Sequence, residues 1–212
     1  ADQVVRAVEA ALRPHAAELL SVQSVRELLD ALERGAPALV HDTVPKPVTL
    51  RLLTEVLRRL LAEDVSIRPL DVILETLGSE AQHETDAGTL TERVRVRLGR
   101  QISFAHARDG VLALHPLDPM VEDALRSAAR IGGSGATAGL ALPPEQARDI
   151  VQAVRSALGQ HASTHAALVA QADIRPHLRK LLEHELPTLA ILGYAELAPE
   201  LRVDLRKPVR VG

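Results

Sequence analysis

Hydrophobic residues in the first half of the chain recur every three or four positions, which is the period of an amphipathic helix. Polar residues, many of them Arg and Glu, fill the positions between them. The pattern predicts five helices, the last of them over 89–102. The residues expected to face inward are, for the first helix, Val4, Val5, Val8 and Leu12; for the second, Val22, Val25, Leu28, Leu29 and Leu32; for the third, Leu50, Leu53, Val56, Leu57, Leu60 and Leu61; for the fourth, Leu70, Ile73, Leu74 and Leu77; and for the fifth, Leu90, Val94, Leu98 and Ile102.

Local signals set the boundaries of these helices. Thr49 is expected to cap the helix that follows it,. Pro69 is expected to open the next helix, because the first helical turn tolerates a residue without an N–H group,. Gly35 and Gly78 are expected to end helices,. Loops are predicted over 35–48 and 79–88.

In the second half, short apolar runs alternate with amphipathic segments. Strands that alternate with helices are typical of a sheet with some parallel pairs. The expected fold class is therefore α+β, with an all-helical subdomain followed by a small α/β subdomain that contains a mixed sheet. Strands are predicted over 110–117, 166–171, 189–197 and 201–211, and helices over 118–130, 143–160 and 173–186, with Asp118 as the cap of the first.

Composition narrows the function classes. Aromatic residues make up 1% of the 212 residues, which argues against single-stranded nucleic-acid binding,. The net charge of −3 does not favour DNA or polybasic membrane binding, and the absence of Cys excludes thiol chemistry,. No apolar run has the length of a membrane span. Because the chain starts at Ala1 and its single Met is Met120, we expect it to be a cut fragment.

The stretch EDVSIRPLDVILETLG (63–78) places two carboxylates one helical turn apart. Asp71 and Glu75, with Arg68 just upstream, could form an acid–base pair with an arginine clamp. Catalysis would also need a cleft, a perturbed pKa and a third group, and no nucleophile lies near them in the sequence. We therefore favour a solvated or subunit-contact face and expect no enzyme.

Two further patterns match ligand sites only in part. His161 and His165 have the spacing of two metal ligands on a helix, but no nearby carboxylate completes the set,. Segment 132–139 is rich in glycine but lacks the order of a phosphate loop, so a flexible loop is expected,. We expect neither a metal nor a cofactor.

Two further sequence patterns are typical of sites that bind macromolecules. Arg175 and Arg179 lie one turn apart with Lys180 beside them, and such a basic strip could meet an acidic partner protein,. Segment 60–78 has the look of a helix-turn-helix, which leaves a DNA-binding regulator as an alternative. The second helix of that motif is acidic, however, and would repel phosphates.

Four segments, in order, resemble one protein family. They are LLSVQSVRELLDAL (19–32), VPKPVTLRLLTEVLRRLLAEDVSIRPLDVILETL (44–77), LTERVRVRLGRQI (90–102) and ADIRPHLRKLLEHELPTLAILGYAEL (172–197). They are similar to the C-terminal cytoplasmic region of the large export-gate protein of bacterial type III secretion and flagellar systems, the FHIPEP family. The resemblance covers almost the whole chain, and it is strongest in 49–77 and 172–197.

The resemblance implies a membrane-anchored protein of the inner membrane whose cytoplasmic domain forms a ring, typically of nine subunits. Such rings receive export chaperones, gatekeepers, export substrates and other export-apparatus components, and they set the order of secretion. This chain would correspond to the end of the first cytoplasmic subdomain (1–20), the all-helical ring-forming subdomain (21–103) and the α/β C-terminal subdomain (104–212). We favour the injectisome branch over the flagellar branch.

The family's ring also assigns a role to the exposed charges of the helical half. The expected subunit-interface residues are Arg68, Asp71 and Glu75, with Arg58, Arg59, Arg93 and Arg97 as their partners. The expected partner-binding residues are Arg175, Arg179 and Lys180.

Overall fold

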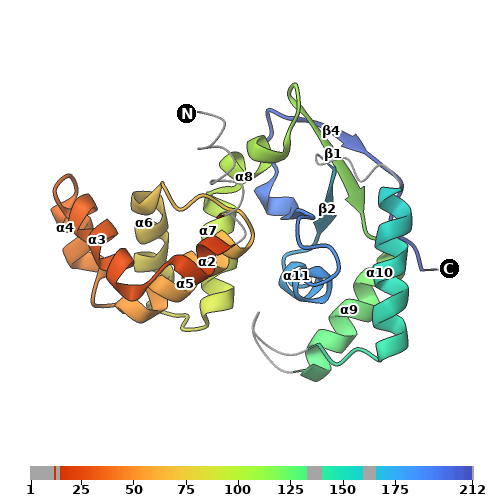
Figure 1. Ribbon diagram of the computed structural model, residues 1–212, viewed down its shortest axis with the longest axis horizontal. Helices are drawn as coiled ribbons and strands as arrows, with labels where there is room; N and C mark the ends of the chain where they lie inside the picture. Colours follow the sequence, from red (N-terminus) through yellow and green to blue (C-terminus); the bar gives the residue numbers. More distant parts are fainter. Residues whose placement is uncertain (1–11, 13–14, 133–139, 160–165, 212) are drawn as a thin grey trace. The chain divides into compact units, whose positions relative to one another are not determined.

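The computed structural model describes residues 12, 15–132, 140–159 and 166–211. The chain divides into two compact units, Ala1–Arg97 and Leu98–Gly212 (Figure 1). The predicted helix at Val4, Val5 and Val8 lies outside the described residues. Within the described residues, no helix combines the length and the apolar character that crossing a bilayer requires.

The described part of the first unit folds into helices alone, as its sequence period predicted. Helix α7 packs against both α5 and α6, α4 packs against α3 and α6, and α3 packs against α5. The predicted inward residues of α6 and α7 are buried, and so are those of α5 apart from Leu50 and Leu61, which are half-buried. The helical stripes of these three helices are thus confirmed. The helices are α2 (Ala16–Leu19), α3 (Val22–Glu33), α4 (Pro37–Thr43), α5 (Leu50–Ala62), α6 (Leu70–Glu80) and α7 (Ala87–Arg97).

The start of α5 follows the predicted cap. The Thr49 hydroxyl accepts a hydrogen bond from the Leu52 N–H at 3.1 Å, so it satisfies one of the N–H groups that a helix start leaves open,. Pro69 stands directly before α6, in the cap position rather than inside the helix. Both local signals therefore mark the correct boundaries.

Val22 and Leu28, predicted to face inward on α3, are instead 47% and 37% exposed, because the buried stripe of that helix is narrow and consists of Val25 and Leu29.

Two other expectations for this unit are wrong. The segment predicted as a loop contains α4, which begins at Pro37, because proline is compatible with the first position of a helix,. Helix α6 continues past Gly78 to Glu80. Gly78 lies against α4, where an added Cβ would come within 3.2 Å of the Thr43 hydroxyl oxygen. That glycine therefore serves close packing of α6 on α4 and does not end the helix.

The second unit has α/β architecture. Its four strands lie in the order β3-β2-β1-β4, and each ladder between them is parallel. The α+β fold class is thus confirmed, whereas the expected mixed sheet is corrected to a parallel one for the described strands. The elements are α8 (Gly99–His106), β1 (Val111–Pro116), α9 (Pro119–Gly132), α10 (Pro144–Leu158), β2 (Ala166–Ala170), α11 (Arg175–Leu182), β3 (Ile191–Gly193), a 3-10 turn η2 (Tyr194–Glu196) and β4 (Arg202–Leu205).

One core joins the helices of this unit to the sheet. Leu125 of α9, Val154 of α10 and Leu178 of α11 are fully buried in a cluster with Leu168 of β2. Burying apolar area at about 25 cal/mol per Å² is the main source of stability for such a layer. The predicted strand over 189–197 is shorter than expected, because the chain turns at η2 directly after β3.

Segment 89–102, which was predicted as one helix, forms parts of two helices. Helix α7 ends at Arg97 and α8 begins at Gly99, with Leu98 between them. Gly99 touches the backbone of Glu196, since an added Cβ would lie 2.7 Å from the Glu196 Cα. The contact with η2 explains the glycine at the start of α8, and it could not be inferred from the local period of the sequence.

Candidate functional site

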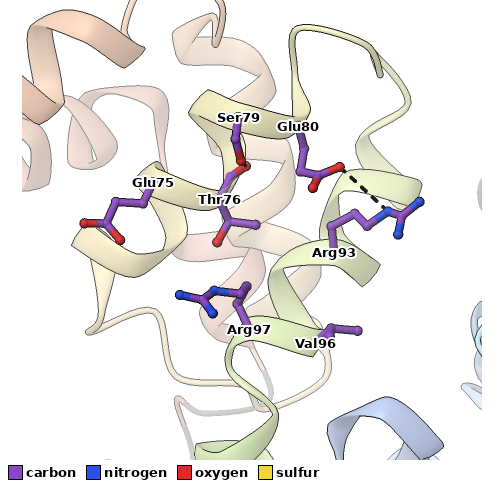
Figure 2. A pocket seen from close by; sticks show the side chains of 7 residues that line it. All are labelled: Glu75, Thr76, Ser79, Glu80, Arg93, Val96 and Arg97. Atoms are coloured by element: carbon purple, nitrogen blue, oxygen red, sulfur yellow. Dashed lines mark hydrogen bonds and ion pairs between the residues drawn. The ribbon is translucent and has the colours of Figure 1, made fainter.

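A charged groove of about 380 Å³ lies between α6 and α7 in the helical unit. We call it the α6–α7 groove. Acidic side chains come from α6 and basic side chains from α7, so the two walls carry opposite charge (Figure 2). Its lining residues are Glu75, Thr76, Ser79, Glu80, Arg93, Val96 and Arg97.

The charges of the groove differ in how far they are neutralised. The Arg93 Nε lies 3.9 Å from a Glu80 carboxylate oxygen, and this pair occupies one end of the groove (Figure 2). Glu75 and Arg97 lie toward the other end, and within the described residues neither has an ion-pair partner. Val96 adds an apolar surface, since 43% of it is exposed. The groove therefore offers unpaired charge and apolar area to another molecule.

The hydroxyl groups that line the α6–α7 groove already donate hydrogen bonds. Thr76 donates to the Val72 carbonyl at 2.8 Å, and Ser79 donates to the Thr76 carbonyl at 2.9 Å. Both bonds close on α6 itself, so these hydroxyls are not poised as nucleophiles. The groove has the properties of a contact surface rather than of a reaction centre.

The predicted carboxylates of α6 are exposed. Asp71 and Glu75 are four residues apart on the helix, and Arg68 precedes them in the connecting segment,. The described residues contain no ion-pair partner for any of the three. We refer to Asp71 and Glu75 together as the α6 ridge.

Two of the predicted interface arginines are engaged inside the helical unit. The Arg58 Nε donates to the Leu20 carbonyl at 2.8 Å, and this bond ties α5 to the end of α2. The Arg59 Nε lies 2.9 Å from the Glu55 carboxylate, one turn earlier on α5. These contacts leave Arg68, Arg93 and Arg97 as the more exposed members of the predicted set.

Sequence reasoning missed a buried ion pair in the same unit. Arg95 of α7 is 2% exposed, and its Nη1 lies 3.2 Å from the carboxylate of Glu63 at the end of α5. A signal was present in the sequence, because Arg95 is three residues before Leu98, which was predicted to face inward, and residues at this spacing share a helix face,. Arg95 therefore fixes α5 against α7.

The basic strip predicted on α11 is not a strip on the surface. Arg175 is 1% exposed, its Nη1 donates to the Ile191 carbonyl at 3.2 Å, and its Nε lies 4.0 Å from the Glu196 carboxylate. The expectation that Arg175 meets a partner protein is therefore corrected, because its guanidinium group supports β3 and η2 from inside. Arg179 is half-buried and donates to the carbonyls of Leu189 and Pro187. Of the three, Lys180 alone is exposed.

An ionic cluster lies at the carboxyl ends of β1 and β2. Arg126 of α9 bonds Asp173 at 2.6 Å and Asp123 at 2.9 Å, and its Nη2 lies 4.0 Å from Glu122. Burial raises the pKa of Glu122 above its ordinary value, and the Arg126 charge opposes this rise. The pKa of Tyr194 is also raised, first by burial and then by the Glu122 charge. The cluster links α9 to the start of α11.

His177 is the described residue whose buried polar atom has no partner. It is 5% exposed, and its Nδ1 makes no hydrogen bond within the described structure. Its pKa is lowered, mainly by burial and then by the charge of Lys180. His161 and His165, whose spacing was weighed as that of two metal ligands, lie outside the described residues.

Comparison with known proteins identifies the family. Residues 1–202 match the FHIPEP family. The low calcium response locus protein D of Yersinia pestis is 34% identical over 196 residues, which are 91% of this chain and 27% of that protein. The flagellar biosynthesis protein FlhA of Caulobacter vibrioides is also 34% identical, over 91% of this chain and 28% of its own length. The chain thus spans between a quarter and a third of the length of these relatives.

Solved structures agree with both units of the fold. The CdsV protein of Chlamydia pneumoniae superimposes with a TM-score of 0.90 at 31% identity, over 98% of this chain and 60% of that chain. It has also been solved in complex with CdsO. Nonameric SctV-C of EPEC superimposes with a TM-score of 0.88 at 26% identity, over 98% of this chain and 63% of that chain. As its sequence resemblance predicted, the chain belongs to the FHIPEP family.

Proposed function

We propose that this chain is the cytoplasmic part of a type III secretion export gate and that it assembles into a homo-oligomeric ring. The observation that carries this proposal is its likeness, over 98% of its length, to SctV-C of EPEC, which is nonameric. A nonamer is accordingly the proposed state of the full-length protein. The helix-turn-helix alternative is set aside, because family membership accounts for segment 60–78 without DNA.

Within this proposal, each part of the chain has a place in the export gate. Residues 1–20 would end the first cytoplasmic subdomain, 21–103 would form the ring, and 104–212 would be the C-terminal subdomain. The full-length protein would sit in the inner membrane with these residues on the cytoplasmic side.

The charged surface of the helical unit is the proposed site of ring contact. Arg68, Asp71, Glu75 and Arg97 are exposed, and they have no ion-pair partner within the described residues. Exposed ion pairs contribute only about 0.2–1 kcal/mol each and are screened by salt. A ring held by such contacts would be weak and salt-sensitive in solution, and tethering at a membrane would offset this weakness by raising the local concentration.

Ring formation can be tested on the chain as it is. Sedimentation velocity over a range of protein and salt concentrations should reveal association into a closed species that high salt disperses. Asp71→Arg should weaken this association, whereas Arg108→Glu, an exposed change in the other unit, should leave it unaltered. A chain that stays monomeric under every condition would contradict the proposal that these residues form the ring contacts.

The proposed partners of the assembled gate are export chaperones, gatekeepers, export substrates and other components of the export apparatus. Their docking would set the order of secretion. The complex of CdsV with CdsO supports a role of this region in binding other apparatus proteins. Lys180 remains the proposed contact for an acidic partner, because Arg175 and most of Arg179 are engaged internally. Unchanged affinity of Lys180→Glu for a cognate chaperone–substrate complex would remove Lys180 from this role.

The injectisome is the proposed system. CdsV and SctV-C, the solved neighbours, support this choice. The flagellar export gate is the second candidate, because FlhA of Caulobacter vibrioides matches at the same 34% identity as the Yersinia protein. Chimeric proteins that carry this chain in place of the matching region should restore secretion in an injectisome mutant and not motility in a flagellar mutant.

A further inference from the structure

A ring of identical subunits needs two complementary faces on each subunit, because its contacts are heterologous. Most of the arginines expected to face the α6 ridge do not supply the second face. Arg59 is paired with Glu55 on its own helix, and the Arg93 Nε lies 3.9 Å from a Glu80 carboxylate oxygen. Arg97 lines the same groove as Glu75, so it lies on the same surface. A counter-charge for the ridge must come from a different part of the helical unit.

A second groove, of about 570 Å³, provides such a surface. We call it the α5 groove. It is built by the starts of α3, α5 and α7, and none of its described lining residues belongs to α6. It is lined by Val22, Thr49, Arg51, Leu52, Thr54, Glu55, Arg58 and Ala87.

The α5 groove carries net positive charge. Arg51 is exposed and has no ion-pair partner within the described residues. Arg58 bonds a carbonyl group, so its charge is not neutralised by that contact. The acidic residue of the groove, Glu55, is already paired with Arg59 at 2.9 Å. An incoming carboxylate would therefore meet uncompensated arginine charge.

The groove is also partly apolar. Val22 is 47% exposed, and Leu52 beside it is half-buried. On the other face, Val72 lies beside Glu75, three residues earlier on α6, and is half-buried as well,. Stable interfaces combine an apolar centre with a charged rim, and this pair of surfaces offers both.

We infer that the α6 ridge of one copy docks into the α5 groove of the next copy, with Arg51 as the counter-charge of Asp71 and Glu75. This inference rests on the proposed ring and names its two faces. Valines and Leu52 meet at the centre, and the ion pairs lie at the rim. The arrangement repeats head to tail, as closure of a ring requires.

Cross-linking tests the contact directly, because the chain contains no Cys. Arg51→Cys and Glu75→Cys chains are mixed and treated with a bis-maleimide of short flexible spacer. A disulfide would be too short, since an arginine–glutamate pair holds its Cα atoms further apart than a disulfide spans. The expected product is a heterodimer that forms at least about tenfold faster than in a control mixture of Arg108→Cys and Glu75→Cys. Equal rates in the two mixtures would overturn the inference.

Charge exchange provides an independent measurement. Arg51→Glu should weaken association of the chain by about tenfold in sedimentation experiments at low salt. The same weakening is expected for Asp71→Arg with Glu75→Arg, and combining all three changes should restore part of the affinity. Association that Arg51→Glu leaves unaltered would overturn this pairing while the ring itself stands. A wild-type chain that stays monomeric under every condition would overturn the inference together with the proposal that the helical unit supplies the ring contacts.

Discussion

Replacing Gly99 with Ala tests the packing that joins α8 to the turn after β3. The added Cβ would lie 2.7 Å from the Glu196 Cα and 2.9 Å from the Glu196 carbonyl oxygen. These are backbone atoms, and Glu196 is 2% exposed and within 4.0 Å of the buried Arg175. The turn is held further by the Ser103 hydroxyl, which accepts a hydrogen bond from the Ala198 N–H at 3.1 Å. Neither side of the contact can move without loss of other bonds.

The size of the effect follows from two opposing contributions. Overpacking a core costs about 1–3 kcal/mol, and the upper end applies here because backbone rather than a flexible side chain must shift. In the opposite direction, the higher helix propensity of Ala over Gly stabilises the folded state by at most about 1 kcal/mol. We therefore expect Gly99→Ala to lower the free energy of unfolding of the α/β unit by about 2 kcal/mol. This corresponds to about 8 °C in Tm for a unit of this size.

Thermal and denaturant unfolding, followed by circular dichroism, measure the effect. Gly35→Ala is the matched control, since the one atom near its added Cβ is the Leu32 carbonyl oxygen, at an ordinary 3.8 Å. It should change stability by no more than about 0.5 kcal/mol. If Gly99→Ala were as well tolerated as Gly35→Ala, the close approach of α8 to Glu196 would be refuted.

Five other substitutions, one of them a control, test the remaining structural claims by the same unfolding measurements. Thr49→Ala removes the cap of α5 and should cost about 1 kcal/mol, as should Ser21→Ala at the start of α3, where the Ser21 hydroxyl accepts from the Ser24 N–H,. Arg95→Ala should cost about 3 kcal/mol because it breaks a buried ion pair, whereas Arg93→Ala on the same helix, with an exposed partner at 3.9 Å, should cost less than about 0.5 kcal/mol,. His177→Leu removes the unpartnered Nδ1 and should raise stability by about 1 kcal/mol at pH 7,. Because burial depresses the pKa of His177 below its ordinary 6.5, the folded state binds fewer protons than the unfolded state between the two values. Wild-type stability should therefore fall as pH drops through that window, and this dependence should shrink in His177→Leu. Equal pH profiles of the two proteins would contradict the assignment.

The helical half was predictable where the signals are local. The leucine stripe of α5 and the hydroxyl of Thr49 act within a few residues, so the sequence alone is enough to place the helix and its start. The interpretation of Pro37 as a loop residue failed, because proline permits both a loop and a first helical turn,. The choice between a loop and a helix at Pro37 is made by the burial of Val40 and Thr43 in the core.

Other features depend on contacts far apart along the chain. The break before Gly99 depends on Glu196, and the bond from Ala198 to Ser103 spans 95 positions. The short β3 likewise ends where Glu196 turns inward beneath Arg175. No period in the sequence carries this information, because it arises from the packing of α8 against η2 and of α11 against β3.

The arginines of this chain explain why its contact surface was harder to predict than its fold. A guanidinium group has several donors and can be satisfied by backbone carbonyls, as in Arg58, Arg175 and Arg179, so its charge does not guarantee exposure,. Spacing on a helix cannot separate these structural arginines from the ones that remain available to another molecule. The available charged side chains are identified by setting aside each one that is paired or hydrogen-bonded within the fold. Among the charges that remain on the helical unit, the α6 ridge and Arg51 belong to different helices and have opposite sign. A closed ring of identical subunits requires two such complementary surfaces on each subunit.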